Sequence, residues 1–306
     1  MGRTPAGIGT AFRYRDALAQ GATRAGIRRA VEEGRIARYA RGVYASGTTR
    51  WDEIAAAVAR LGGEAVASHE TAAELWGLPL LGPAPATIQL TRPRRRTGTD
   101  RYPGLTVHHA AVPARHRTLH LGIPVTTPAR TAVDIARVRP FRAGVSTADG
   151  ALRLRRCHRE HLLAVTEDCA GWPGVRRARE VAGFADARAA NPLESISRVA
   201  FHEYRLPRPV LQAEVGGLAV VDFLWQEYGV VGEADGMGKY VDLAALHREK
   251  HRQENLEHDG LVVVRWTWRD AYRRPDALAH RVGGVLFRRG WRPDTRRPDP
   301  AWGAGW

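Results

Sequence analysis

Residues 14–44 read YRDALAQGATRAGIRRAVEEGRIARYARGVY, and this stretch decides the fold of the N-terminal part of the chain. Its first seven residues predict a short helix, which a Gly-Ala turn follows. Thr23 is the expected N-cap of a second helix, with Ile27 and Val31 in its apolar stripe. The last ten residues predict a basic β-hairpin. Helix, turn, helix and hairpin in this order predict a winged helix-turn-helix, whose second helix enters the major groove of DNA.

Arginines dominate the charge of this predicted module. Residues 1–50 contain ten Arg against three acidic residues, a net charge of +7, and the whole chain carries a formal charge of +15. Such an excess favours polyanions as partners, because contacts with phosphates release counterions. A solubilising surface charge is the alternative. We expect double-stranded DNA as the partner, bound by arginines of the second helix and the hairpin: Arg24, Arg28, Arg29, Arg35, Arg38 and Arg41.

The bulk composition indicates a soluble protein of more than one domain. With 306 residues the chain exceeds one ordinary core, and 44% hydrophobic and 26% charged residues are typical of globular proteins. It has no apolar run long enough to span a membrane, and its start does not read as a signal peptide. Its two cysteines suit a reducing compartment. We therefore predict a cytoplasmic protein with no membrane partner.

Four segments give the first 140 residues a likeness to a known family. These segments are Asp16-Ala17-Leu18, Arg41-Gly42-Val43-Tyr44, Ser68-His69-Glu70-Thr71-Ala72-Ala73 and Pro124-Val125-Thr126-Thr127-Pro128-Ala129-Arg130-Thr131. They resemble the AbiEi-type abortive-infection antitoxins of type IV toxin–antitoxin systems. The resemblance implies a DNA-binding, often autoregulatory module, with a cognate toxin protein as a further partner. We also keep a homodimer as an open expectation.

An acidic segment interrupts the basic chain between residues 194 and 240, where seven Asp and Glu face four Arg and Lys. Residues 218–225 and 229–233 predict the two strands of a hairpin. With a two-residue loop at 227–228, Asp222 lies opposite Glu233, the side chains about 5 Å apart, and Asp235 projects from the same face. Like charges so placed repel unless a cation lies between them, so the pattern predicts a Mg²⁺ or Mn²⁺ site. The alternatives are a solvated hairpin and a slipped register.

Residues 190–285 continue as helix, hairpin, helix and strand. This order resembles the core of PD-(D/E)xK nucleases, in particular the branch of very-short-patch-repair endonucleases and their uncharacterised DUF559 relatives. The segments that carry the likeness are Pro192-Leu193-Glu194-Ser195, Val221-Asp222-Phe223-Leu224-Trp225, Glu233-Ala234-Asp235-Gly236, Glu249-Lys250-His251-Arg252-Gln253-Glu254 and Val264-Arg265-Trp266-Thr267-Trp268-Arg269-Asp270.

The nuclease resemblance implies hydrolysis of a phosphodiester by metal-activated water. It implies that Asp222 and Glu233 bind the metal and that Glu194 is an accessory acid. Asp235 occupies the position at which the family has a lysine, which is a departure from the pattern. Lys239 or the chain's only other lysine could supply the missing cation, and we favour Lys239. If neither lysine reaches the site, the domain binds metal and DNA without cutting.

Simpler interpretations of single residues stay open. Glu194 could be a first-turn acid that pairs with Arg198, and Asp235 could be a turn residue before a glycine. A predicted helix at 243–257 carries histidines at helical spacing that could hold zinc, although a solvated face is more usual.

The predicted third strand of this region, residues 261–268, is largely apolar. Trp266 and Trp268 are two residues apart, so they share one face of that strand. We expect both rings to pack in the core, and base stacking is the alternative.

These observations predict an α/β (α+β) protein in which DNA binding is combined with a nuclease-like domain acting in phage defence or DNA repair. A non-catalytic, antitoxin-like transcriptional regulator with a degenerate nuclease fold is the alternative. The segments we predict are a winged helix at 1–48, a mixed α/β domain at 51–140, a helical connector at 141–190, a nuclease-like domain with a central mixed sheet at 191–290 and a disordered tail at 291–306.

Overall fold

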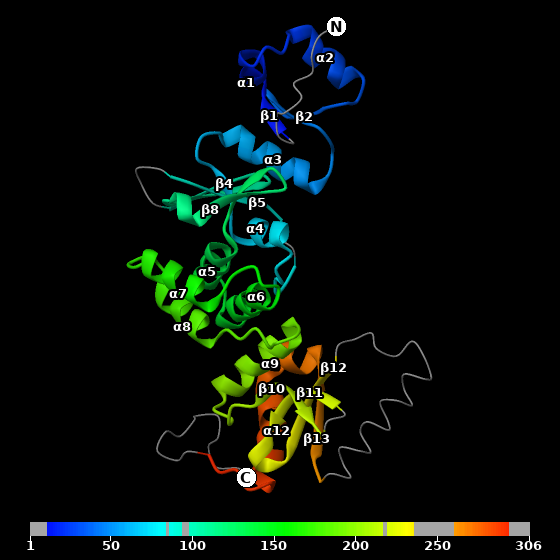
Figure 1. Cartoon of the computed structure of the whole chain (residues 1–306), viewed down its shortest axis with the longest axis vertical. Helices are drawn as coiled ribbons and strands as arrows, with labels where there is room; N and C mark the ends of the chain where they lie inside the picture. The colour runs from blue at the N-terminus through cyan, green and yellow to red at the C-terminus, as the bar shows by residue number, and fades with distance from the viewer. Residues whose placement is uncertain (1–10, 84–85, 94–97, 217–218, 236–259, 294–306) are drawn as a thin grey trace. The chain divides into compact units, whose positions relative to one another are not determined.

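The structure is a computed structural model of the chain, drawn in Figure 1. It describes residues 11–83, 86–93, 98–216, 219–235 and 260–293. The chain divides into two compact units, of which the first contains 1–139 and 156–182 and the second 140–155 and 183–306. The mixture of helices with mixed sheets confirms the predicted α+β class. No helix in the described ranges has the length and apolarity that crossing a bilayer requires.

The first unit begins with the predicted order of helix, turn, helix and hairpin. Its elements are β1 (Ala11–Arg13), α1 (Tyr14–Ala19), α2 (Arg24–Glu32), β2 (Ala37–Ala40) and β3 (Val43–Ala45). Strand β1, which the sequence analysis did not predict, pairs with β3 and completes a three-stranded sheet in the order β1-β3-β2. The turn between β2 and β3 is tight because Gly42 adopts a φ of +72°, which favours glycine.

Helix α3 (Arg50–Leu61) connects this small sheet to the rest of the unit. Thr49 and Asp52 form a capping box at its start. Ala56 of α3 then packs with Val43 and Ala45 of the three-stranded sheet in one apolar cluster. The predicted boundary between 1–48 and 51–140 is therefore a packed contact.

A six-stranded sheet forms the centre of the first unit, in the order β6-β7-β5-β4-β9-β8. Ile54 of α3 lies in the same core cluster as Leu90, Val107 and Val125 of the sheet. The strands are β4 (Val66–Ala67), β5 (Ile88–Arg92), β6 (Gly98–Tyr102), β7 (Leu105–His109), β8 (Arg117–His120) and β9 (Ile123–Thr126). The helices are α4 (His69–Trp76), η1 (Ala114–His116), α5 (Pro128–Val138), α7 (Arg159–Asp168) and α8 (Val175–Phe184), whose last residues belong to the second unit.

The second unit contains a four-stranded mixed sheet in the order β10-β11-β12-β13, with α9 and α12 beside it (Figure 1). Its strands are β10 (Val210–Val215), β11 (Ala219–Trp225), β12 (Val230–Asp235) and β13 (Val262–Thr267), and η2 (Gln226–Tyr228) joins β11 to β12. Its helices are α6 (Phe141–Arg153), α9 (Pro192–Glu203), α11 (Trp268–Arg273) and α12 (Pro275–Arg288). The rings of Phe201, Phe223 and Trp266 meet in its core.

The predicted connector, residues 141–190, is divided between the two units. Helix α6 belongs to the second unit and packs against α9, whereas α7 belongs to the first. Buried Asp149 of α6 forms an ion pair with buried Arg198 of α9 at 3.1 Å. It also accepts a hydrogen bond from the backbone N–H of Asp186 at 2.7 Å. Residues 140–155 are therefore part of the core of the second unit.

The predicted register of the β11–β12 hairpin is confirmed as far as Phe223 opposite Gly232. The predicted two-residue loop is wrong, because residues 226–229 form a four-residue connection that ends on Gly229 with a φ of +59°. Adding one residue to each side of a loop leaves its centre in place, so the register survives the longer loop. Asp222 and Glu233 are the next residues along their strands.

Strand β13 is less buried than we predicted. It pairs in parallel with β12 at the edge of the sheet, and Val262 is exposed while Val264 is buried. Trp266 packs in the core as expected, and its indole N–H donates to Ser197 Oγ at 2.7 Å. The prediction for Trp268 is wrong, because the strand ends at Thr267 and Trp268 begins α11. A residue that starts a helix no longer shares the face of the strand before it.

Candidate DNA-binding surface and acidic cluster

Helix α2 presents one buried and one charged face. Thr23 caps the helix as predicted, because its hydroxyl accepts a hydrogen bond from Gly26 N–H at 3.0 Å. Ile27 and Ala30 are buried. Val31 was expected in the same stripe, but it is 37% exposed, one residue before the helix ends at Glu32. The stripe that holds α2 is therefore narrower than predicted.

The six predicted DNA-binding arginines are all exposed. Arg24, Arg28 and Arg29 lie on α2, and Arg38 and Arg41 lie on the hairpin of β2 and β3. None of these five forms an ion pair with another residue of the described ranges. The sixth differs, because Nε of Arg35 donates to Glu33 Oε2 at 2.7 Å and its charge is partly neutralised.

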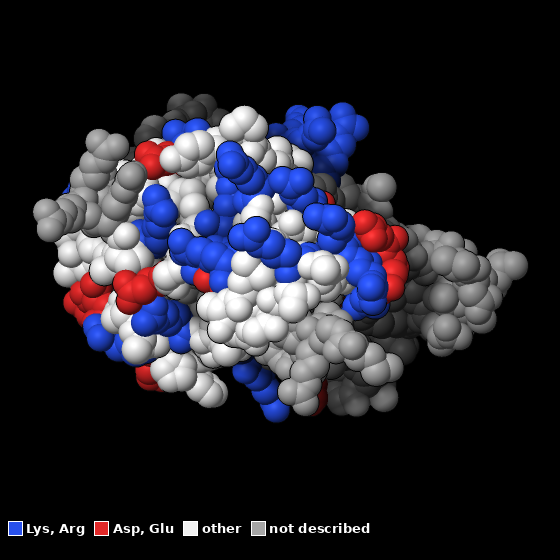
Figure 2. All heavy atoms as spheres, turned by 90° about the horizontal axis from the view of Figure 1, so that it is seen from above, with Lys and Arg blue, Asp and Glu red and all other residues white. Residues whose placement is uncertain are grey.

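Figure 2 looks onto the end of the first unit that carries the winged helix. Arginine side chains gather across the middle of this face, with few acidic groups among them. A helix N-terminal region and a β-hairpin that carry unpaired arginines can bind phosphates on both sides of a groove. The arrangement is thus suited to contact with duplex DNA.

The acidic cluster of the second unit is built around Glu194 in the first turn of α9. Glu194 is 1% exposed, and its own N–H donates to the Asn191 side chain at 3.0 Å. Its carboxylate accepts from Asn191 Nδ2 at 2.7 Å and from Ala190 N–H at 2.8 Å. Arg198, the alternative partner predicted for Glu194, forms its ion pair with Asp149 instead. Glu194 is therefore fixed by the N-terminal turn of its own helix.

Gln212, which the sequence analysis did not identify, connects Glu194 with Asp222. Its Nε2 donates to Glu194 Oε2 and to Asp222 Oδ1, both at 3.0 Å. Gln212 has a φ of +48° within β10, and the pairing of β10 with β11 skips Gln212 and Asp222. The other oxygen of Asp222 accepts from Ala234 N–H of β12 at 2.8 Å. Two carboxylates thus converge on one amide group.

Glu233 and Asp235 lie further along β12. Glu233 is 7% exposed, and its partner in the parallel register is Arg265 of β13. Asp235 is half-buried and is the last residue of β12. Gly236 lies outside the described residues, so the alternative of a turn residue at Asp235 stays a prediction. Among the residues with described positions, no three or more His, Cys, Asp or Glu side chains are placed to hold a metal ion together. The two converging carboxylates supply oxygen ligands of the kind that hard cations bind, although the four predicted acids do not form one cluster.

Lys239 lies outside the described residues, as does the predicted histidine-bearing helix at 243–257. The signal that could have revealed Gln212 is the alternation of Leu211, Ala213 and Val215 with polar residues, which is the period of a half-buried strand.

A buried polar network occupies the Pro124–Thr131 segment and the helix that follows it. Thr127 caps α5 as an acceptor for Arg130 N–H at 3.4 Å. Arg130 Nε donates to Asp134 Oδ2 at 2.8 Å, and both side chains are 1% exposed. Arg137 donates to the other Asp134 oxygen at 3.0 Å. Burial alone would raise the pKa of Asp134, but the adjacent Arg130 and its neighbours hold it below its usual value.

The same network reaches α7 through His116. Arg130 Nη1 donates to His116 Nδ1 at 3.0 Å, so this nitrogen is unprotonated and His116 Nε2 donates to Asp168 Oδ2 at 2.8 Å. Burial, followed by the charge of Arg130, lowers the pKa of His116. The hydrogen bond from Arg115 lowers the pKa of Asp168 to about 2. These contacts fix α5, η1 and α7 to one another.

A second buried group lies where α4 begins. His69 has a φ of +51° and stacks on His108 of β7, with ring centroids 3.8 Å apart. Ser68 Oγ accepts from Thr91 Oγ1 at 2.7 Å and lies 3.0 Å from His69 Nδ1. Burial lowers the pKa of His69 to about 3 and that of His108 to about 4, so both rings are neutral at pH 7. The Ser68–Ala73 segment thus serves the packing of the first unit.

The comparisons with known proteins match two segments, which lie mostly in the first unit and include residues 140–155 and 183–184 of the second. Residues 9–47 match the family described as "Transcriptional regulator, AbiEi antitoxin", and residues 65–184 match "AbiEi antitoxin C-terminal domain". These matches confirm the AbiEi resemblance of the N-terminal region. Both end before residue 191, so the nuclease resemblance of the second unit stays a prediction.

Two uncharacterised proteins of Mycobacterium tuberculosis are similar over most of the chain. MT2308 of strain CDC 1551 / Oshkosh and Rv2248 of strain ATCC 25618 / H37Rv are each 32% identical over 263 residues. The match covers 84% of this chain and 95% of each relative. The chain therefore belongs to the family of these mycobacterial proteins and contains both AbiEi antitoxin domains.

Proposed function

We propose that the protein is a DNA-binding transcriptional regulator of the AbiEi antitoxin type. The observation that carries the proposal is the row of exposed arginines on α2 and on the β2–β3 hairpin, five of which have no ion-pair partner among the described residues. This row lies within the residues that match the AbiEi regulator family. Of the two functions that the sequence predicted, the non-catalytic regulator is therefore the better supported.

In this proposal α2 lies in the major groove and the hairpin lies on the sugar-phosphate backbone. Arg24 and Arg28 are four residues apart, so they lie on one side of the helix and can reach the same groove. Arg38 and Arg41 extend the positive surface along the hairpin. Each arginine that neutralises a phosphate releases a counterion, and the affinity for DNA should fall steeply as salt is added.

A salt titration tests this proposal. Fluorescence anisotropy would measure the affinity of the full chain for a duplex from upstream of its own reading frame, over a range of salt concentrations. We expect Arg24→Ala and Arg28→Ala each to weaken binding and to reduce the slope of log K against log salt by about 0.9 per lost phosphate contact. Matched controls are Arg156→Ala and Arg176→Ala, which remove exposed arginines of the same unit outside the winged helix. Unchanged slopes for the α2 variants would contradict the proposal.

A cognate toxin is the protein partner that we propose for such a regulator. Support comes from the match of residues 65–184 to an antitoxin domain. Co-expression with the product of an adjacent reading frame, followed by growth measurements, would test it. Growth arrest that this chain does not relieve would contradict the antitoxin role.

We propose metal-dependent phosphodiester hydrolysis by the second unit as the second candidate function. The observation that favours it is the convergence of Glu194 and Asp222 on the side-chain amide of Gln212. Buried Glu233 lies on β12, the strand next to that of Asp222. Glu194 and Asp222 would supply carboxylate oxygens to Mg²⁺ or Mn²⁺, and Glu233 would have to move towards them to join as a third ligand, because no three acids of the described residues are placed around one metal position. A bound cation of this kind supplies an activated water and stabilises the charge that develops on a phosphate. Asn191 and Gln212 would orient the two carboxylates through the hydrogen bonds described above.

Plasmid nicking separates the two candidates. The full chain would be incubated with supercoiled plasmid and Mg²⁺ or Mn²⁺ beside an Asp222→Asn variant, with Asp276→Asn, at an exposed position of α12, as the control. Nicking by the native chain and the control, and not by Asp222→Asn, would establish the enzyme. If all three proteins bind the plasmid and none nicks it, the regulator is the only one of the two candidate functions that remains.

A further inference from the structure

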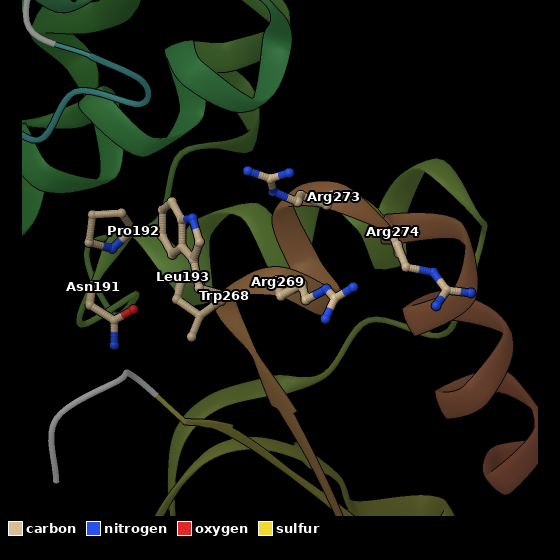
Figure 3. A pocket seen from close by; sticks show the side chains of 7 residues that line it. All are labelled: Asn191, Pro192, Leu193, Trp268, Arg269, Arg273 and Arg274. Carbon is tan, nitrogen blue, oxygen red and sulfur yellow. The ribbon is translucent and has the colours of Figure 1, made fainter.

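The second unit contains a hollow of about 960 Å³ at the start of α9 (Figure 3). Figure 3 shows the indole of Trp268 beside Pro192 and Leu193, with guanidinium groups of α11 and its C-terminal end on the other side. The hollow is lined by Asn191, Pro192, Leu193, Trp268, Arg269, Arg273 and Arg274. It therefore combines one aromatic surface with three cations.

The aromatic surface is held in place by its neighbours. Trp268 stacks on Tyr272, one turn further along α11, with ring centroids 5.5 Å apart and an angle of 15° between the planes. Arg142 of α6 lies 4.7 Å from the centroid of the Tyr272 ring and donates to the Tyr272 carbonyl at 3.0 Å. Trp268 is half-buried, so part of its ring remains accessible from the hollow. A fixed, accessible ring can stack on a flat ligand with little loss of side-chain entropy.

The three arginines around the hollow are exposed, and none forms an ion pair within the ranges that the structure describes. Arg269 and Arg273 are four residues apart on α11, a spacing at which like charges repel one another. Asp270 on the same helix does not neutralise them, because it accepts from Thr267 and pairs with Arg281. Their grouping is therefore suited to an anionic ligand.

We propose that this hollow binds a single strand of DNA, with a base stacked on Trp268 and phosphates bound by Arg269, Arg273 and Arg274. Aromatic rings with arginines beside them are the means by which proteins bind single strands without reading their sequence. In a duplex the faces of the bases are covered by their neighbours, so a base can reach Trp268 from an unpaired strand only. The site is distinct from the duplex-binding surface proposed for the winged helix, and binding here does not require cleavage.

The wall of the hollow adjoins the acidic cluster. Asn191 lines the hollow and exchanges two hydrogen bonds with Glu194. A strand bound against Trp268 would pass beside the carboxylates that the second candidate function uses.

Fluorescence anisotropy of the full chain with two labelled strands tests the proposal. One strand is an oligothymidylate, and the other is an abasic strand with the same number of phosphates. We expect Trp268→Ala to weaken oligothymidylate binding by about 5- to 100-fold, the loss of one base–aromatic stack, and to leave the abasic strand unaffected. Trp268→Phe should retain most of the affinity, because a smaller ring still stacks.

The arginines have their own readout. Arg273→Ala should lower the salt slope for both strands by about 0.7, the loss of one contact with a single-stranded phosphate. Arg288→Ala, at an exposed position of α12, is the matched control and should not change this slope. The proposal would be overturned if Trp268→Ala binds the oligothymidylate as tightly as the native chain does. It would also be overturned if the variant loses affinity for the oligothymidylate and the abasic strand to the same extent. If Trp268→Ala does not fold, an unchanged slope for Arg273→Ala would overturn it, since that exposed side chain does not support the core.

Discussion

The buried pair of Arg130 and Asp134 is a sensitive point of the first unit. In Asp134→Ala, Arg130 keeps its position at 1% exposure without its carboxylate partner, and Arg137 loses one acceptor. Removal of one partner of a buried ion pair costs about 3–5 kcal/mol, because the remaining charge is left without compensation. The face of Trp172, 4.8 Å from Arg130, compensates only part of that charge. Each kcal/mol lowers the melting temperature of a domain of this size by about 2–4 °C, so we expect a decrease of about 6–20 °C.

Differential scanning calorimetry of the full chain would measure this change, with Asp276→Ala, at an exposed position of α12, as the control. A second variant separates the charge from the packing. Arg130→Met combined with Asp134→Leu replaces the pair by apolar side chains, and such replacements are often neutral or stabilising. We expect the double variant to be less destabilised than Asp134→Ala alone. A loss below about 1 kcal/mol for Asp134→Ala would refute the reasoning, because it would show that Arg130 does not depend on its partner.

Two further predictions concern buried groups. Burial holds the pKa of His69 at about 3 and that of His108 at about 4, whereas both rings bind protons near pH 6.5 once the chain unfolds. The folded chain resists protonation of both rings, so its free energy of unfolding is highest above pH 6.5 and falls as the pH drops from 6.5 towards 4. Urea titrations at several pH values would detect this fall, and a pH-independent unfolding midpoint over this range would contradict it. Gly232→Ala should destabilise the second unit by about 1–3 kcal/mol, because the added Cβ would lie 2.5 Å from the Trp266 ring. Thermal melting would measure this loss, and a variant that melts at the same temperature as the wild type would show that the ring can move.

The winged helix and the hairpin register could be predicted because their signals are local. Thr23 caps α2 through a residue three positions away, and the register of β11 and β12 follows from the centre of one short loop. The alternation of apolar residues gave the correct hairpin strands, although the loop itself was longer than expected. Local patterns do not contain long-range pairings, and β1 was missed for this reason, since it is defined by its pairing with Ala45 and Val43.

The acidic cluster was only partly predictable. Asp222 and Glu194 do converge, yet the residue that connects them, Gln212, lies on a strand that the sequence analysis did not predict. Sequence spacing also did not show that the carboxylates of Glu194 and Asp222 would accept backbone hydrogen bonds from Ala190 and Ala234. The change from strand to helix at Thr267 moved Trp268 out of the core, and a capping box with Asp270 is the local signal that marks this change.

The assignment of α6 to the second unit limits how the chain can be divided or recombined. The polypeptide passes between the units three times, near residues 140, 156 and 183, so no single cut separates them. A fragment that starts at residue 183 would lack Asp149, and Arg198 would then be buried without its carboxylate. A gene fusion that transplants the C-terminal unit onto another DNA-binding domain would have to carry residues 140–155 with it. During synthesis on the ribosome, α6 is made before the rest of its unit, which cannot be completed until residues 183–306 have followed.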